Sequence, residues 1–150
     1  MNDIGLFLIN NCFDISIKDD KIESDDGLET AVAISTFTDR RITEDDQDPL
    51  RKSKRGWWGD LFPDESDDQI GSRLWLLERE KSTINNLKRA EEYIKECLDW
   101  MIDDGVAQAI NATASFDDTK QLIIETEIVR PDGESIRYEI NWDAQELRRS

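Results

Sequence analysis

The sequence predicts an α+β fold in which two helices pack on one face of an antiparallel sheet. Apolar residues recur at three- and four-residue steps over residues 27–38 and 82–103, which is the spacing of amphipathic helices. They alternate with polar residues in three runs towards the C-terminus, which is the spacing of half-buried strands. Because the connections between these runs are short, we expect an antiparallel meander. The length favours one domain, residues 1–150.

The N-terminal residues are expected to form a strand pair that extends this sheet. Phe13, Ile15 and Ile17 alternate with polar residues, which predicts a strand with one buried face. A turn at Asp19-Asp20 would return the chain as a short strand over residues 21–23. The following helix is expected to begin at a capping box, in which Asp26 caps the first turn and Glu29 reaches back.

The main helix is predicted from its cap, its apolar stripe and its stop signal. Ser82 is the expected cap, and Gly105 is placed to be the left-handed residue that ends the helix. The stripe is typical of a core rather than of a cofactor site. It consists of Ile84, Leu87, Ala90, Ile94, Cys97, Leu98 and Met101.

Three strands are expected to complete the chain, with turns at Asp117-Asp118 and at residues 130–133, where Pro131 and Gly133 favour a tight turn. The inward positions of the first two strands are Val106, Ile110, Ala112, Ala114 and Phe116, followed by Leu122, Ile124 and Ile128. The third strand has the cleanest alternation. Its inward residues are Ile136, Tyr138, Ile140 and Trp142, and its outward ones include Arg137 and Glu139.

The composition excludes several classes of function. With 35 acidic and 19 basic residues the net charge is −16, which argues against nucleic acid or an anionic membrane as a partner. The absence of histidine removes the commonest general base and histidine-ligated zinc. No apolar run approaches the roughly 20 residues that span a bilayer. We therefore expect no catalytic residues, no cofactor and no metal, and Cys97 is expected to be a buried thiol.

Two charge clusters leave alternatives open. Residues 51–55 carry four basic side chains in an acidic protein, either as a solvated loop or as a docking patch for an acidic neighbour. Residues 64–68 carry four carboxylates, but their spacing lacks the glycine and terminal glutamate of an EF-hand loop. An exposed acidic turn is therefore the favoured interpretation of the second cluster.

An irregular insertion is expected at about residues 39–72. Its tryptophan-rich stretch begins at residue 55 and runs on to residue 75. Three of the five tryptophans lie between residues 55 and 75, two of them between glycines. Indoles combine a large apolar area with one donor, so they anchor cores or interfaces, and glycines allow positive φ and close approach. We expect this loop to fold over the domain as a partly intramolecular anchor, braced by an Asp60–Arg73 pair. The expected anchor residues are Arg55, Gly56, Trp57, Trp58, Gly59, Asp60, Arg73 and Trp75.

The same stretch resembles the signature of a Mu-type phage tail family known as gene product forty-six. The matching runs are residues 55–60 and 71–77, with weaker matches at 28–32, 37–41, 90–93 and 104–107. Members of that family are similar to the baseplate wedge protein that starts the sheath of contractile tails. That wider group often carries a Glu-Pro-Arg triplet after its main helix. This chain has Asp103-Asp104-Gly105 there, so contacts of the triplet do not carry over.

The resemblance implies a structural protein of the virion tail baseplate, assembled in the cytoplasm of the host bacterium. The implied partners are a baseplate wedge protein, the tail sheath protein, and tail tube or spike-hub proteins. Sheath subunits would add strands to an open sheet edge, for which the last predicted strand is the candidate: Ile136, Arg137, Tyr138, Glu139, Ile140 and Trp142. Two other classes stay open from the residues alone, an acidic mimic of nucleic acid and a carboxylate-based cell-wall glycosidase.

Overall fold

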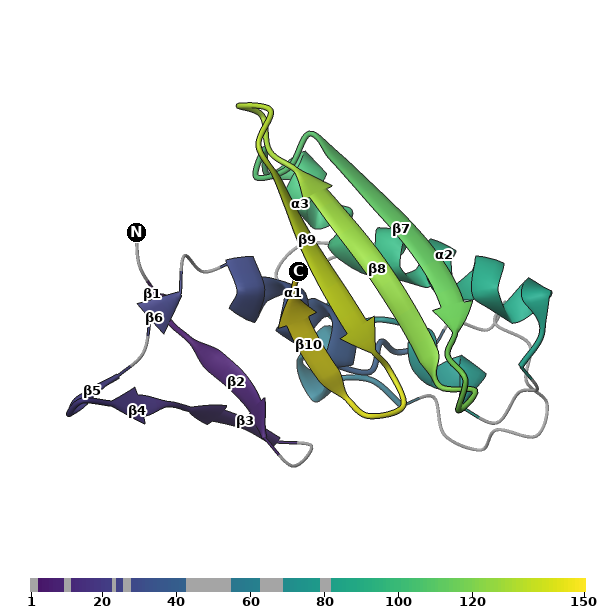
Figure 1. Cartoon of the computed structure of the whole chain (residues 1–150), viewed down its shortest axis with the longest axis horizontal. Helices are drawn as coiled ribbons and strands as arrows, with labels where there is room; N and C mark the ends of the chain where they lie inside the picture. The colour runs from purple at the N-terminus through teal and green to yellow at the C-terminus, as the bar shows by residue number, and fades with distance from the viewer. Residues whose placement is uncertain are drawn as a thin grey trace.

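The computed structural model describes residues 3–9, 12–22, 24–25, 28–42, 55–62, 69–78 and 82–150. Its centre is a four-stranded antiparallel sheet in the order β10-β9-β8-β7. The strands are β7 (Ala109–Phe116), β8 (Leu122–Val129), β9 (Ser135–Asn141) and β10 (Glu146–Arg149). Three helices lie behind this sheet in Figure 1: α1 (Leu28–Phe37), α2 (Ile84–Leu98) and α3 (Trp100–Asp103). The predicted α+β class is therefore confirmed.

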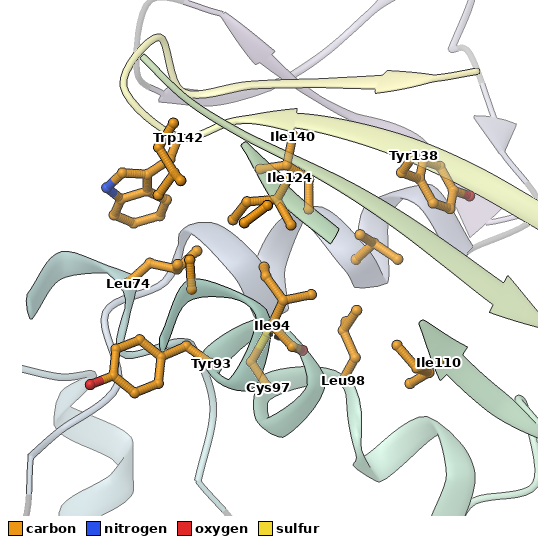
Figure 2. Close-up of a cluster of buried hydrophobic side chains, with 14 of the residues drawn as sticks. Leu74, Tyr93, Ile94, Cys97, Leu98, Ile110, Ile124, Tyr138, Ile140 and Trp142 are labelled. Atoms are coloured by element: carbon orange, nitrogen blue, oxygen red, sulfur yellow. Dashed lines mark hydrogen bonds between the residues drawn. The ribbon is translucent and has the colours of Figure 1, made fainter. Parts of the chain in front are cut away.

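The core lies between the sheet and α2, as the two periodicities predict. The inward residues of β8 and β9 meet the stripe of α2, and Ile94, Leu98, Ile124 and Ile140 have no exposed surface (Figure 2). Glu125, beside Ile124 in β8, faces the other side and is exposed. Alternation therefore predicted correctly which face of each of these strands is buried.

The ends of the main helix differ in detail from the prediction. Thr83, not Ser82, is the N-terminal cap, and its hydroxyl oxygen accepts from the Asn86 N–H at 3.4 Å. Gly105 has a φ of +71°, which confirms the predicted left-handed stop. Val106 follows this stop in a turn and is exposed, so its expected inward place in the first strand is wrong.

The strand predicted to be the open edge is an inner strand. β10 pairs with β9 from Glu146 opposite Asn141 to Arg149 opposite Tyr138. The expected template, residues 136–142, is thus hydrogen-bonded on both sides over most of its length. The prediction missed β10 because Leu147 is its only apolar residue, so the segment has no alternation to read.

The N-terminal strands do not extend the main sheet, contrary to expectation. They form three separate pairs: β1 (Asp3–Ile4) with β6 (Ser24–Asp25), β2 (Leu6–Ile9) with β3 (Cys12–Ile15), and β4 (Ile17–Lys18) with β5 (Lys21–Ile22). In Figure 1 they project from α1 away from the sheet. Phe13, Ile15 and Ile17 are exposed, so the predicted burial of this face is wrong for the described structure. The predicted capping residue Asp26 and the charged clusters at 51–54 and 64–68 lie outside the described residues.

Two 3-10 turns complete the described elements: η1 (Trp58–Leu61) and η2 (Leu74–Leu77). Both belong to the tryptophan-rich stretch, and they differ in burial. All four residues of η2 are buried, whereas none of η1 is. The stretch therefore has a buried inner part, residues 71–77, and an exposed outer part, residues 55–62.

Candidate functional site

The inner part, residues 71–77, is fixed to the end of α1 by its backbone. Ser72 N–H donates to the Thr38 carbonyl, and Arg40 N–H donates to the Ser72 carbonyl, each at 2.9 Å. The Ser72 hydroxyl also donates to the Thr36 carbonyl at 2.6 Å. Gly71 makes this approach possible, because it has a φ of +99° and a Cβ there would lie 2.4 Å from the Thr38 oxygen.

Trp75 is a core residue. Its side chain is 2% exposed, and its indole N–H donates to the Arg40 carbonyl at 2.9 Å. The guanidinium of Arg55 covers the ring, 5.0 Å from its centroid, and lies 3.4 Å from both Asp39 and Glu78. Burial raises the pKa of Asp39, Arg55 opposes this rise and Glu78 adds to it. Of the predicted anchor residues, Arg55 and Trp75 thus hold the domain together.

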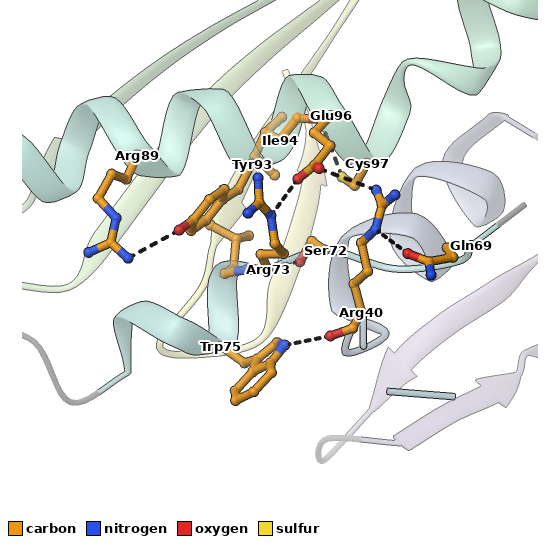
Figure 3. A network of polar contacts seen from close by, with 11 residues as sticks. Arg40, Gln69, Ser72, Arg73, Trp75, Arg89, Tyr93, Ile94, Glu96 and Cys97 are labelled. Carbon is orange, nitrogen blue, oxygen red and sulfur yellow. Dashed lines mark hydrogen bonds and ion pairs between the residues drawn. The ribbon is translucent and has the colours of Figure 1, made fainter. Parts of the chain in front are cut away.

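Arg73 connects the inner part to α2 (Figure 3). Its Nε donates to Glu96 Oε2 at 2.8 Å, and its guanidinium lies 4.7 Å from the Tyr93 ring centroid. Arg40 contacts the other oxygen of Glu96 at 3.6 Å. The predicted Asp60–Arg73 pair is wrong, because Arg73 bonds to the helix and Asp60 Oδ1 accepts from the Ile70 N–H at 3.4 Å.

The tryptophan pair of the outer part contacts the domain only in part. Trp57 is 47% exposed and Trp58 is 73% exposed. Their ring centroids are 5.6 Å apart. The two glycines act as predicted in allowing close approach. Gly56 has a φ of +96° and lies against Arg41, and a Cβ on Gly59 would clash with the Trp57 ring.

Four apolar side chains of the outer part are exposed within six residues of the chain. They are here called the aromatic surface: Trp57, Trp58, Leu61 and Phe62. Phe62 is the most exposed of them at 80%. Contiguous exposed apolar side chains mark interaction sites in soluble proteins. Leu61 and Phe62 were missed in the sequence, although their position directly after the tryptophan pair was a usable signal.

A groove of about 330 Å³ borders the aromatic surface. One wall is Trp57, and another is Trp100, whose indole N–H donates to the Ser35 hydroxyl at 3.1 Å. Ile34, Ile70 and Asp60 also line it. Trp100 was missed because it lies outside the apolar stripe that predicted the main helix.

The described residues contain no group of three or more Cys, Asp or Glu side chains placed to hold a metal ion. Burial raises the pKa of the Cys97 thiol to about 12, so Cys97 is protonated at neutral pH and is a poor nucleophile. None of the described helices has the length and apolar character of a membrane span.

Comparison with known proteins gives the family. The family described as Phage protein GP46 matches residues 28–135. The chain is 41% identical over 140 residues to the "Baseplate protein gp46" of Escherichia phage Mu, covering 93% of this chain and 94% of the relative. It is 35% identical over 144 residues to the "Mu-like prophage FluMu protein gp46" of Haemophilus influenzae, covering 95% and 98%. The match spans both parts of the tryptophan-rich stretch, and the chain belongs to the phage protein GP46 family.

Proposed function

We propose that this protein is a structural, non-enzymatic component of a contractile-tail baseplate that joins the wedge to the first ring of sheath subunits. The name of the Mu relative supports the baseplate role. The observation that carries the proposal is the aromatic surface. It belongs to the same stretch as the inner part, residues 71–77, whose Trp75 is buried in the core. Assembly would take place in the host cytoplasm, with tube or spike-hub proteins as further neighbours.

The aromatic surface is the proposed contact for the wedge protein. Tryptophan is enriched among the residues that dominate binding energy at protein interfaces. Trp58 and Phe62 leave most of their area in water, and covering them releases that water without first unfolding any part of the domain. The backbone of the loop is held by two hydrogen bonds, from the Asp60 N–H to the Trp57 carbonyl at 3.2 Å and from the Phe62 N–H to the Gly59 carbonyl at 3.0 Å. A loop ordered before the partner arrives lowers the entropic cost of binding.

The second proposed contact is the open edge of β10, where a sheath strand would add to the sheet. Ser150 N–H donates to the Arg137 carbonyl at 3.0 Å. Opposed residues in an antiparallel pair alternate between hydrogen-bonded and non-bonded pairs, so the backbone groups of Leu147 and Arg149 point away from β9. No other described strand pairs with that side.

The opposite edge of the sheet is less suited to strand addition. There the Ala114 N–H of β7 donates to the Glu91 carboxylate of α2 at 2.9 Å. An added strand would have to displace this charge-assisted bond. This contrast favours β10 as the edge that receives a partner.

The wedge contact is tested in phage that carry the doubly substituted gene, Trp58→Ala with Phe62→Ala. Both side chains are exposed, so the variant is expected to fold and melt like the wild type but to be missing from purified baseplates. Mass spectrometry of the particles measures its incorporation. Ile84→Ala is the control, since Ile84 is an apolar side chain that is 77% exposed at the start of α2, outside both proposed contacts, and this variant should enter baseplates normally. Wild-type incorporation of the double variant would contradict the wedge contact.

The edge contact is tested by Arg149→Pro. Proline removes one outward N–H and is tolerated at a sheet edge, so the variant is expected to fold and join the baseplate but to leave the tail without sheath in electron micrographs. Arg149→Ala is the control, because it removes the side chain and keeps the N–H. Sheathed tails from the proline variant would show that β10 is not the template.

A further inference from the structure

We infer that the groove between Trp57 and Trp100 binds an arginine side chain of a neighbouring protein in the assembly. The inference rests on the proposed docking role of this surface and specifies the chemistry of the partner. Both tryptophans line the groove and are partly exposed, at 47% and 40%, so part of each indole is accessible to a side chain that enters it. The groove is apolar apart from a few polar groups, of which Asp60 is the only charged one among the described lining residues.

The carboxylate of Asp60 is the first reason to expect a cation. Its Oδ1 accepts a long hydrogen bond of 3.4 Å from the Ile70 N–H. Its Oδ2 is buried and accepts no hydrogen bond from the described residues. A buried carboxylate oxygen without a donor is unfavourable. Because Asp60 lines the groove, a small rotation of its carboxylate toward a cation seated there would give Oδ2 a donor.

At two other places in this protein, an arginine guanidinium contacts both an aromatic ring and a carboxylate. Arg55 lies 5.0 Å from the Trp75 ring centroid and 3.4 Å from the Asp39 carboxylate. Arg73 lies 4.7 Å from the Tyr93 ring centroid and 2.8 Å from the Glu96 carboxylate.

The groove has the rings and the carboxylate of this arrangement, and no basic residue among its described lining. A neighbouring protein would supply the third member.

Arginine fits this place better than lysine. A planar guanidinium stacks on an indole face while its N–H groups reach a carboxylate. The net charge of −16 would also attract a basic segment of a neighbour before contact. The apolar side chains beside the ion pair lower the local dielectric constant and strengthen the pair.

The experiment is a titration of the full-length, ¹⁵N-labelled protein with the blocked peptide acetyl-Gly-Ala-Arg-Ala-Gly-amide. The five indole N–H signals of the five tryptophans are followed by NMR. The signals of Trp57 and Trp100 are expected to shift in a saturable way, and that of the buried Trp75 is expected to stay in place. A peptide with citrulline, the neutral isostere, is expected to give no saturable shift.

Two variants connect the binding to the groove. Asp60→Asn keeps an oxygen that can accept from the Ile70 N–H, so it should fold, and it is expected to weaken peptide binding at least about tenfold, as loss of a charged hydrogen-bond partner does. Asp103→Asn changes the net charge equally on the exposed surface of α3 and is expected to leave binding unchanged. Trp57→Leu serves as a second test that leaves the carboxylate in place, and it too is expected to weaken binding.

Three results would overturn the inference: no saturable shift with the arginine peptide, an equal response to citrulline, or equal weakening by Asp60→Asn and Asp103→Asn. None of them involves tail assembly. A protein that fails these tests and still enters baseplates through its aromatic surface would leave the proposed function standing. A protein that binds the peptide but never enters baseplates would instead contradict the proposed function.

Discussion

Residues 71–77 and residues 55–62 belong to one tryptophan-rich stretch, yet the first is part of the core and the second lies on the surface. The first is held by the backbone bonds of Ser72 to Thr38 and Arg40, which place Trp75 over the end of α1. In the second, two glycines allow a tight backbone path, and Trp57 and Trp58 are partly exposed to solvent. Tryptophan content alone therefore does not separate a core anchor from an interface. The backbone hydrogen bonds of each segment distinguish the two.

The largest difference is expected from Trp75→Ala. The indole is 2% exposed and its N–H is bonded to the Arg40 carbonyl, so the substitution leaves a cavity and an unpaired carbonyl. We expect the free energy of unfolding to fall by about 3–5 kcal/mol. Urea unfolding followed by circular dichroism measures this loss. A loss below about 1 kcal/mol would mean that Trp75 is not a core residue.

The two cysteines provide a second measurement of the same variant. Cys12 is exposed and Cys97 is buried, with a pKa raised by burial to about 12. A thiol reagent should therefore label Cys12 at once, and Cys97 only when the domain opens. Trp75→Ala should accelerate labelling of Cys97 at least about a hundredfold, because a loss of 1.4 kcal/mol corresponds to a factor of ten.

Gly71→Ala tests the close approach between the inner part and the end of α1. The residue has a φ of +99°, and the added methyl would lie 2.4 Å from the Thr38 oxygen. We expect a loss of about 1–3 kcal/mol in the free energy of unfolding. Gly105→Ala is the matched control, since its φ is also positive, at +71°, but no atom lies within 4 Å of the added methyl. Equal losses in the two variants would show that backbone strain, and not the close approach, governs this site.

The sequence predicts the regular elements well where periodicity is strong. Ile94 and Leu98 on the main helix, and Ile124 and Ile140 on the strands, are buried as predicted, because a helix or strand with one apolar face must bury that face. β10 was missed because Leu147 is its only apolar residue. Its pairing is determined by the preceding turn and by the exposed backbone of β9, neither of which leaves a pattern.

The candidate site was predicted only in part. The stretch was recognised from its tryptophans and glycines, but the direction of each indole depends on residues far away in the chain. Arg73 bonds to Glu96, 23 positions later, and its predicted partner Asp60 instead accepts from Ile70. The carboxylate chosen by an arginine in an acidic chain depends on tertiary contacts that local spacing does not encode.

Arg73→Met examines the link between the inner part and α2. The variant removes the bond to Glu96 and the contact with Tyr93, while Glu96 keeps its contact with Arg40 at 3.6 Å. We expect a loss of about 1 kcal/mol in the free energy of unfolding, because the pair is charge-assisted but partly exposed. Arg137→Met breaks an exposed pair with Glu127 and should leave unfolding unchanged. The link has no structural role if Arg73→Met behaves like this control.

The smallest effect on stability is expected from Trp58→Ser. Its indole is 73% exposed, so serine removes apolar area that is already in water, and the free energy of unfolding should change by no more than about 0.5 kcal/mol. Cys97 labelling should likewise keep its wild-type rate. Because the aromatic surface loses its largest exposed ring, the same variant should still lose affinity for its partner in the particle. A stability loss as large as that of Trp75→Ala would mean that Trp58 is a core residue. The distinction between the inner and outer parts would then fail.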